Sequence, residues 1–316
     1  MRVLVTGGAG YIGSVTAALL LSRGHQVVVL DSLATGHSDA VPPGAGFVPA
    51  DLLDTAALGR VFEAPFDSVL HFAARALVGE SVEHPDLYFR TNIGGTLNLL
   101  DAMRTHGVGR IVFSSSAATY GEPDEVPIVE DAPTRPTNPY GASKLAADQV
   151  LTAYAGAYGV AATSLRYFNV AGAYGRQRER HDPETHLIPN LLTAARGGAA
   201  AFTLHGTDYP TPDGTCIRDY VHVEDLAEAH LLALEAAVAG EHRIYNLGSG
   251  SGYSVREVLA EVERVTGRPV EVVEGPRRSG DPARLVASSA RIERDLGWQR
   301  RRTLADMIRD AWAALP

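Results

Sequence analysis

The sequence predicts an α/β protein built on a doubly wound parallel sheet (Rossmann-like), with a second, smaller α/β lobe for substrate. Three observations lead to this fold class. An apolar strand, a glycine-rich turn, a helix and a second apolar strand follow one another within the first 31 residues, which is a βαβ unit. Apolar runs and helical segments then alternate up to about residue 167, as in parallel sheets covered by helices. The 316 residues suffice for a large core and two lobes.

The first βαβ unit carries a dinucleotide-binding pattern. Val3-Leu4-Val5 is predicted as a strand, and the turn after it contains Gly7, Gly10 and Gly13. Glycines let the backbone turn tightly and approach a pyrophosphate, which rests on the free N–H groups of the following helix. We expect that helix to continue through Ser22.

The second strand, Val27 to Leu30, leads into an acidic residue. Asp31 is placed to accept hydrogen bonds from the hydroxyls of an adenosine ribose, although a plain turn residue is the alternative. Residues 32–45 contain no Lys or Arg to meet a 2′-phosphate. The pattern therefore predicts NAD as the cofactor and disfavours NADP.

The next elements continue the cofactor site. Asp51-Leu52 is expected at the end of a short strand beside the adenine, and residues 69–74 are predicted as a fourth strand whose small residues admit the dinucleotide. His71 lies in that strand; it could be a catalytic base, but a packed histidine is the favoured interpretation. Asn92 is expected to open a helix.

A run of serines follows the fifth predicted strand. Ile111-Val112-Phe113 would deliver Ser114, Ser115 and Ser116 to the carboxyl edge of the sheet, where ligands bind in such folds. Ser116 is the candidate to hydrogen-bond a reacting hydroxyl, and turn chemistry is the alternative. Residues 121–139 contain five prolines and are predicted as a loop.

Tyr140 and Lys144 form the candidate acid–base pair. Lys144 is the only lysine, so its position suggests a task that arginine cannot perform. Tyr140 precedes it by four residues and shares its face of the predicted helix. Lowering a tyrosine pKa from about 10 to near 7 takes about 4 kcal/mol, which Lys144 and an oxidised nicotinamide ring could supply together. A chance Tyr-x-x-x-Lys on a surface helix is the alternative.

Composition and charge narrow the classes of function. A net charge of −9 disfavours nucleic acid and anionic membranes as partners, because these need a basic face. Met1-Arg2 leads directly into the first strand, and no run of about 20 apolar residues occurs, so we expect no secretion signal, no membrane span and a cytoplasmic protein. The single cysteine, Cys216, excludes an intramolecular disulfide and is expected to be buried.

Several motifs together resemble a known family. Four of them are similar to motifs of the extended short-chain dehydrogenase/reductases: Thr6-Gly-Gly-Ala-Gly-Tyr-Ile-Gly13, Phe113-Ser-Ser-Ser116, Pro139-Tyr-Gly-Ala-Ser-Lys144 and Arg166-Tyr-Phe-Asn169. Four others extend the resemblance to the UDP-glucose 4-epimerase family over nearly the whole chain: Asp208-Tyr-Pro-Thr, Asp213-Gly-Thr-Cys-Ile-Arg-Asp-Tyr-Val-His222, Tyr245-Asn-Leu-Gly248 and Arg278-Ser-Gly-Asp281. Two positions depart from the family pattern: Ala118 replaces a hydroxyl residue, and Arg75-Ala76 stands where some members have Leu-Lys.

The resemblance implies a reaction and a set of roles. It implies a homodimeric isomerase of galactose metabolism that interconverts UDP-galactose and UDP-glucose by C4 epimerisation through a 4-keto intermediate. Tyr140 would take the 4-hydroxyl proton, and Ser116 would hydrogen-bond the same oxygen. The alternatives are a UDP-N-acetylglucosamine 4-epimerase, a nucleotide-sugar 4,6-dehydratase and a non-catalytic dinucleotide sensor. Ala117 and Ala118 disfavour the dehydratase, which needs an added acid and base after its active-site hydroxyl residue.

The residues expected to contact NAD come from the pattern and the resemblance together. They are Gly7, Gly10, Tyr11, Ile12, Gly13, Asp31, Ser32, Asp51, Leu52, Phe72, Ala73, Ala74, Arg75, Asn92, Ser114, Tyr140, Lys144 and Tyr167. The resemblance places the UDP-hexose against Ser116, Asn169, His186, Leu187, Leu204, His205, Arg218, Tyr220, Val255, Arg278, Asp281 and Leu285. Arginines suit paired phosphates as forked donors. We expect no metal ligands.

The second lobe is expected to span residues 168–316, with about 219–247 rejoining the NAD-binding lobe of residues 1–167. Helices are predicted from His186, over 224–239 and over 254–265, and a strand over 244–247. Residues 176–180 are interpreted as a solvated loop, and 300–302 as a basic surface run with a partner site as the alternative.

Substrate range is expected to depend on Leu285. In the family that this chain resembles, one residue near this position borders C2 of the sugar, and a tyrosine there excludes 2-acetamido sugars. Leucine is smaller than tyrosine but offers an acetamide no hydrogen bond. We therefore expect a preference for UDP-glucose and UDP-galactose, with weak activity on their N-acetyl forms.

Overall fold

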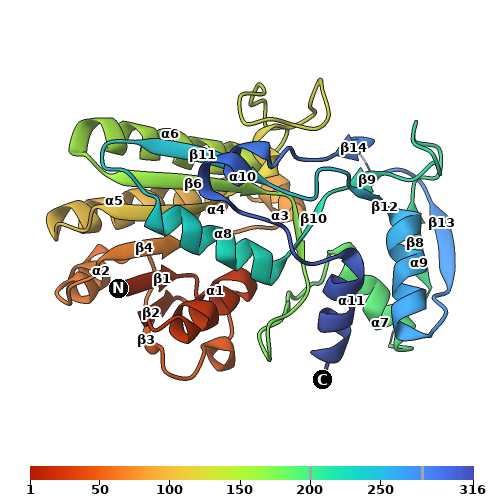
Figure 1. Cartoon of the computed structure of the whole chain (residues 1–316), viewed down its shortest axis with the longest axis horizontal. Coiled ribbons are helices and arrows are strands. Elements are labelled where there is room, and N and C mark those ends of the chain that lie inside the picture. The colour runs from red at the N-terminus through yellow and green to blue at the C-terminus, as the bar shows by residue number, and fades with distance from the viewer. Residues whose placement is uncertain (199–200, 279–280) are drawn as a thin grey trace.

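A seven-stranded parallel sheet forms the centre of the first lobe in the computed structural model (Figure 1), which describes residues 1–198, 201–278 and 281–316. The strand order is β11-β6-β5-β4-β1-β2-β3, which is the doubly wound arrangement that the sequence predicts. The strands are β1 (Arg2–Thr6), β2 (Gln26–Asp31), β3 (Gly46–Pro49), β4 (Ser68–His71), β5 (Arg110–Ser116), β6 (Ala161–Tyr167) and β11 (His242–Leu247).

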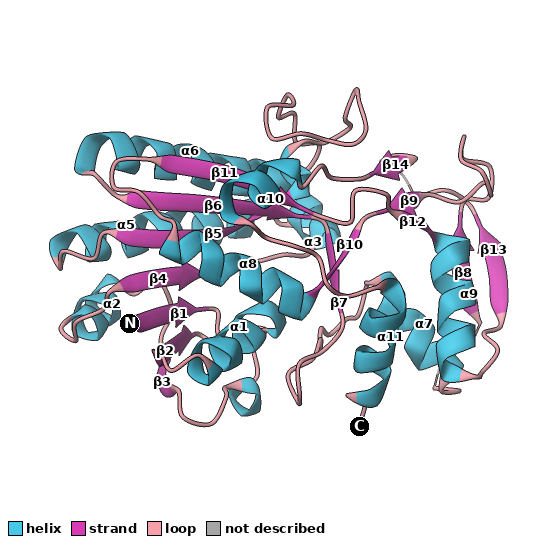
Figure 2. Ribbon diagram, in the orientation of Figure 1, coloured by secondary structure: helices cyan, strands magenta, loops and turns pink. Residues whose placement is uncertain are grey.

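Side chains alternate between the two faces of the sheet along each strand, so both faces carry apolar side chains. Helices cover both of these faces (Figure 2). Val3 and Val5 pack into one apolar cluster with α1 (Tyr11–Ser22), α8 (Val223–Glu235) and α10 (Ala290–Leu296). Leu4 packs into the opposite cluster with α2 (Thr55–Phe62), α5 (Gly95–Thr105) and α6 (Pro139–Tyr158). The carboxyl edge between the two layers is left free for ligands.

The chain returns to the sheet after part of the second lobe. Strand β11 pairs in parallel with β6, from His242 opposite Ala162 to Leu247 opposite Tyr167. Helix α8, which precedes β11, packs against α1. Strand β11 and helix α8 therefore pack with the elements of the first lobe.

Three predicted boundaries between residues 69 and 116 differ from the structure. Strand β4 ends at His71 instead of reaching Ala74, because the Phe72 and Ala73 N–H groups turn to donate to the Thr6 carbonyl. Strand β5 continues through Ser116, which pairs with Tyr167. The helix expected from Asn92 begins earlier: α4 (Pro85–Tyr88) runs into the π-helical turn η2 (Phe89–Gly94) and then α5.

The second lobe is smaller and has its own apolar core. Helices α7 (Leu187–Ala195), α9 (Val255–Thr266) and α11 (Leu304–Ala313) pack together there. Three small sheets flank them: β7 (Asn169–Ala171) with β10 (Tyr220–His222), β8 (Phe202–His205) with β13 (Val272–Gly275), and β9 (Ile217–Arg218) between β12 (Tyr253–Ser254) and β14 (Arg284–Leu285). The remaining elements belong to the first lobe and are η1 (Ser38–Ala40), α3 (Val78–Glu83) and η3 (Ala117–Thr119).

Within the described ranges, none of the helices combines the length and apolar character needed to cross a membrane. Cys216 is buried, as predicted, and has no disulfide partner. The predicted helix over 224–239 is shorter than expected, because α8 ends at Glu235.

Candidate active site

A cavity of about 650 Å³ lies at the carboxyl edge of the sheet, between the two lobes. Its wall contains every residue expected at the cofactor except Asn92. It also contains half of the residues expected at the substrate, namely Ser116, Asn169, His186, Arg218, Asp281 and Leu285. The strand ends of the first lobe therefore face the loops of the second lobe across one space.

The glycine turn at one end of the cavity fits a dinucleotide pyrophosphate. Gly7 has φ +72°, and a Cβ there would lie 2.5 Å from the Ala73 backbone nitrogen. A Cβ on Gly13 would lie 2.3 Å from the Gly7 carbonyl oxygen. Gly10 caps α1 without any side-chain hydrogen bond, so the first N–H groups of α1 remain available to a phosphate.

Asp31 is held at the cavity wall by the backbone. One carboxylate oxygen accepts from the Ala9 N–H at 3.0 Å, and the other accepts from the Leu33 N–H at 2.8 Å. An ionised carboxylate has about four lone-pair sites. The remaining ones allow Asp31 to accept further hydrogen bonds from ribose hydroxyls.

Tyr140 and Lys144 are presented by the first turns of α6. The helix begins where the Asn138 side chain accepts from the Gly141 N–H at 2.8 Å, with Pro139 in the first position. The Lys144 ammonium is buried, donates to the Ser114 carbonyl at 2.7 Å and lies 4.8 Å from the centroid of the Phe113 ring. Burial lowers the pKa of Lys144 to about 8, while Asp148 acts in the opposite direction.

In the absence of a second positive charge, the pKa of Tyr140 is raised from its ordinary value. Burial raises the pKa of the phenol, and a hydrogen bond with Ser116 lowers it in part. The Lys144 ammonium lies 5.9 Å from the centroid of the Tyr140 ring and points to the Ser114 carbonyl. A phenolate at this position therefore needs the further positive charge of an oxidised nicotinamide ring.

His71 lies below the cavity and has both ring nitrogens engaged. Nδ1 lies 2.8 Å from the Thr6 hydroxyl and Nε2 lies 2.9 Å from the Thr96 hydroxyl. Burial lowers the pKa of His71 to about 3, and the Lys144 charge adds to the effect. His71 is thus a neutral packed histidine, which agrees with the favoured interpretation of its sequence position.

Asn92 does not line the cavity but hydrogen-bonds to Arg75, which does, and to Ser143 on α6. Its side-chain oxygen accepts from the Arg75 N–H at 2.8 Å, and its amide donates to the Arg75 carbonyl at 3.1 Å and to the Ser143 hydroxyl at 2.9 Å. The loop after β4 is thereby tied to α6. Ser114 is similarly joined by a hydrogen bond to Tyr167.

Arg218 offers an unused donor to the cavity. Its Nη1 donates to the carbonyls of Ile217, at 3.0 Å, and Pro282, at 2.8 Å. Its Nη2 lies 3.2 Å from an oxygen of Asp281, yet this buried atom makes no well-aligned hydrogen bond within the described residues. A phosphate oxygen would satisfy it.

Six residues expected at the substrate do not line this cavity: Leu187, Leu204, His205, Tyr220, Val255 and Arg278. Leu204 and Val255 pack in a small apolar cluster with Cys216, and Tyr220 packs in the core of the second lobe. Close packing in these two clusters turns the side chains of Leu204, Val255 and Tyr220 away from the cavity. Ser279 and Gly280 of the Arg278-Ser-Gly-Asp281 motif lie outside the described residues.

The segment 176–180 is not the solvated loop that its charge predicts. Glu179 is 9% exposed, and Arg180 pairs with Asp39 in the first lobe at 2.9 Å. Glu179 and His181 also line the cavity, and the sequence analysis missed both. The repeated Glu-x-His spacing, at 179–181 and 184–186, is the sequence signal that could have identified them.

Known proteins resemble this chain over nearly its full length. The profile of the NAD dependent epimerase/dehydratase family matches residues 3–248. A UDP-glucose 4-epimerase of Corynebacterium glutamicum is 55% identical over 314 residues, which cover 99% of this chain and 95% of that protein.

Solved structures agree with the sequence comparison. The UDP-glucose 4-epimerase from Brucella ovis in complex with NAD matches with a TM-score of 0.94 and 49% identity, covering 99% of this chain and 97% of the other. The enzyme from Bifidobacterium longum in complex with NAD+ and UDP matches with a TM-score of 0.93 and 38% identity, covering 99% and 98%. The chain therefore belongs to the NAD dependent epimerase/dehydratase family and, within it, to the UDP-glucose 4-epimerases.

Proposed function

We propose that this chain interconverts UDP-galactose and UDP-glucose by inverting C4 of the hexose, with NAD as its cofactor. The observation that carries the proposal is the arrangement of Ser116, Tyr140 and Lys144 in one cavity. The glycine turn and Arg218 line the same cavity. The family membership supports the same reaction.

The residues of the chain divide the work as follows. Tyr140 takes the proton of the 4-hydroxyl group, and Ser116, which lines the same cavity, holds the same oxygen. When bound, NAD supplies the acceptor and then the donor of the C4 hydride. Lys144 keeps a positive charge beside the reacting groups, fixed by the Ser114 carbonyl.

The substrate side must hold the nucleotide firmly and the sugar loosely, so that a 4-keto sugar can present both faces to the cofactor. Arg218 is fixed by two backbone carbonyls and keeps Nη2 for a phosphate oxygen. Leu285, in the strand paired with Arg218, gives the sugar an apolar wall with no directional hold.

Product analysis tests the proposed function. Purified protein incubated with UDP-galactose should yield UDP-glucose without added cofactor, as identified by NMR of the sugar. Nucleotide released by denaturation should be NAD, because Asp31 faces the ribose and residues 32–45 lack a cation for a 2′-phosphate. Recovery of mainly the 2′-phosphorylated form, or an unchanged sugar, would contradict the proposal.

We also propose that the protein is a cytoplasmic homodimer. Three apolar side chains on neighbouring helical turns support a contact face for a second copy: Val78 is 47% exposed, Val82 63% and Phe89 41%. Sedimentation should give twice the mass of one chain, and Val82→Glu should shift it toward one. A wild-type protein that sediments as a monomer at micromolar concentration would rule this out.

A further inference from the structure

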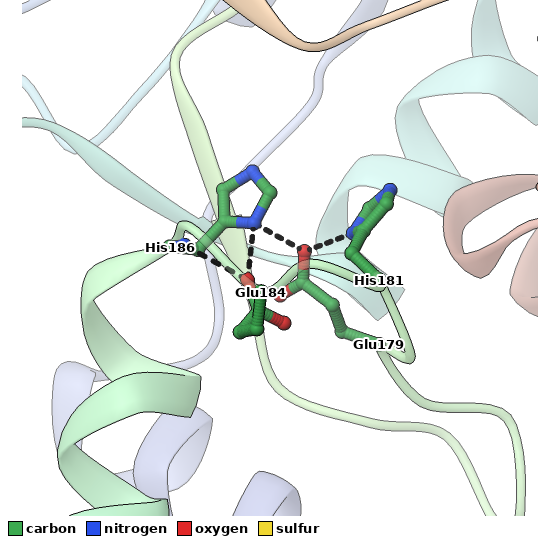
Figure 3. Close-up of side chains that lie close together, drawn as sticks. All are labelled: Glu179, His181, Glu184 and His186. Carbon is green, nitrogen blue, oxygen red and sulfur yellow. Dashed lines mark hydrogen bonds and ion pairs between the residues drawn. The ribbon is translucent and has the colours of Figure 1, made fainter. Parts of the chain in front are cut away.

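Four side chains with metal-binding atoms lie close together (Figure 3), and three of them, Glu179, His181 and His186, line the cavity. An oxygen of Glu179 lies 2.8 Å from Nδ1 of His181 and 2.9 Å from Nδ1 of His186. An oxygen of Glu184 lies 2.8 Å from the same nitrogen of His186. One ligand atom from each residue can be chosen so that all four lie within 4.8 Å of one another.

The backbone positions this cluster, which we name the Glu-x-His cluster. Glu179 and His181 are two residues apart, as are Glu184 and His186, and His186 is the cap residue before α7. One oxygen of Glu184 accepts from the N–H groups of Thr185 and His186, at 2.8 Å each. These contacts hold the Glu184 carboxylate facing the His186 imidazole, while its second oxygen remains available to a ligand.

We propose that the Glu-x-His cluster binds one divalent transition-metal ion of the zinc type. Two imidazole nitrogens and two carboxylate oxygens are ligands that zinc accepts, whereas Mg²⁺ and Ca²⁺ prefer oxygen alone. Zinc bonds of about 2.0–2.2 Å place tetrahedral ligand atoms roughly 3.4 Å apart. The distances in the cluster, from 2.8 Å up to 4.8 Å, bracket this value.

The surroundings of the cluster give a second reason for a cation. Glu179 is 9% exposed and lines the same cavity as the glycine turn and Arg218, which fit phosphates. Two carboxylates beside bound diphosphates would repel them unless a positive charge intervened, either a proton on His186 or a bound cation. The other three side chains are 21% to 43% exposed, so an ion can enter from solvent.

The position of the cluster predicts what the ion would do. Arg180 pairs with Asp39 at 2.9 Å, and its carbonyl lies 3.1 Å from the His37 ring, so residues 179–186 connect the second lobe to the loop after β2. A metal ion would fasten this segment where it crosses the cavity. It is thus a structural ion, outside the reaction at C4.

Titration with zinc chloride tests the proposal on untagged holoprotein first dialysed against EDTA. Isothermal titration calorimetry should show about one equivalent of zinc per chain, and zinc should raise the melting temperature. His181→Gln and Glu179→Gln should each weaken binding about 100-fold or more, because each removes a ligand. His106→Gln is the matched control, since His106 is exposed at the end of α5, and its binding should equal that of wild type.

NAD content measured for each variant shows whether it has folded, and this readout does not depend on the metal. If Glu179→Gln fails to fold, the 32% exposed His181 still provides the test. No zinc uptake by the wild type, or equal uptake by wild type and His181→Gln, would overturn the proposal. Either result would mean that the two histidines serve only as hydrogen-bond partners of the two glutamates.

Discussion

Tyr140 and Lys144 lie one turn apart on α6, yet the lysine side chain hydrogen-bonds to the backbone of strand β5 and not to the tyrosine. Its ammonium donates to the Ser114 carbonyl at 2.7 Å and lies over the Phe113 ring. A guanidinium could not occupy this buried position without displacing Phe113 or Ser114. The single lysine of the chain is therefore explained by a compact site for one ammonium group.

Removing the phenol hydroxyl tests the proposed base. Tyr140→Phe should lower kcat by about 10²–10⁴-fold while UDP affinity stays unchanged, because the hydroxyl acts on the sugar. Lys144→Arg should lower kcat by a similar factor. Tyr158→Phe is the control on the same helix, since Tyr158 is 57% exposed, and its rate should match wild type. A near-normal kcat for Tyr140→Phe would show that the proton goes elsewhere.

Leu285 should set the substrate range. It lines the cavity in β14, opposite Arg218 of β9, and offers no hydrogen bond to an acetamide. Burying an unpaired amide costs about 1–3 kcal/mol, so kcat/KM for the N-acetyl substrates should be about 10- to 100-fold lower. Leu285→Tyr should abolish that weak activity and retain the main one. Equal kcat/KM values for the two substrate classes would refute the preference.

At the scale of single elements, helix ends do much of the positioning. Asn138 caps α6 and so sets the start of the helix that carries Tyr140 and Lys144. Thr303 caps α11 reciprocally with Asp306: the Asp306 N–H donates to the Thr303 hydroxyl, and the Asp306 carboxylate accepts from the Thr303 N–H at 2.9 Å. Helix α11 in turn packs against α9 in the core of the second lobe.

Deleting the α11 cap should measure this contribution. Thr303→Ala should lower the free energy of unfolding by about 1 kcal/mol, because backbone donors at the helix start lose their partner. Thr105→Ala is the control, since that exposed hydroxyl donates only to the Asp101 carbonyl of its own helix. Urea unfolding followed by circular dichroism measures both variants. A loss for Thr303→Ala no larger than that for Thr105→Ala would show that the cap is not stabilising.

At the scale of the whole molecule, the packing of helices against the central sheet buries several ionisable groups. His230 on α8 is fully buried beside Phe72 and Tyr167, whose rings face the cavity wall. Burial lowers the pKa of His230 to about 4, partly opposed by its hydrogen bond to the Leu226 carbonyl. His71 is likewise held neutral, with a pKa of about 3.

These two histidines should make stability depend on pH. An unfolded histidine has a pKa of about 6.5, so below that pH the unfolded chain binds protons that the native state does not. Each of the two histidines should therefore lower the free energy of unfolding by about 2 kcal/mol as the pH falls from 7 to 5, and should leave it unchanged above pH 7. His230→Leu should lose about 2 kcal/mol less than wild type over this range in urea unfolding. Equal losses would show that His230 is protonated in the native state.

The sequence by itself determined the local elements and the ligand class of the first lobe. The glycine turn, Asp31 and the Tyr140–Lys144 spacing depend on neighbours within a few residues, so periodicity and turn chemistry reveal them. Asp31 and Gly7 lie at the cavity wall as the pattern predicts. The motifs of the second lobe indicated its ligand only through their resemblance to a family.

Only the tertiary structure decided which distant residues share the cavity. Leu204 and Val255 turn into an apolar cluster, while Glu179 and His181 reach the cavity wall. The Lys144 ammonium donates to the Ser114 carbonyl of β5 and not to the Tyr140 phenol one helical turn away, because β5 and α6 pack closely there. These outcomes depend on packing between segments up to about 140 residues apart, as in the pairing of Asp39 with Arg180. Local sequence patterns such as the Glu-x-His repeat mark candidate residues but do not specify which distant segments meet them.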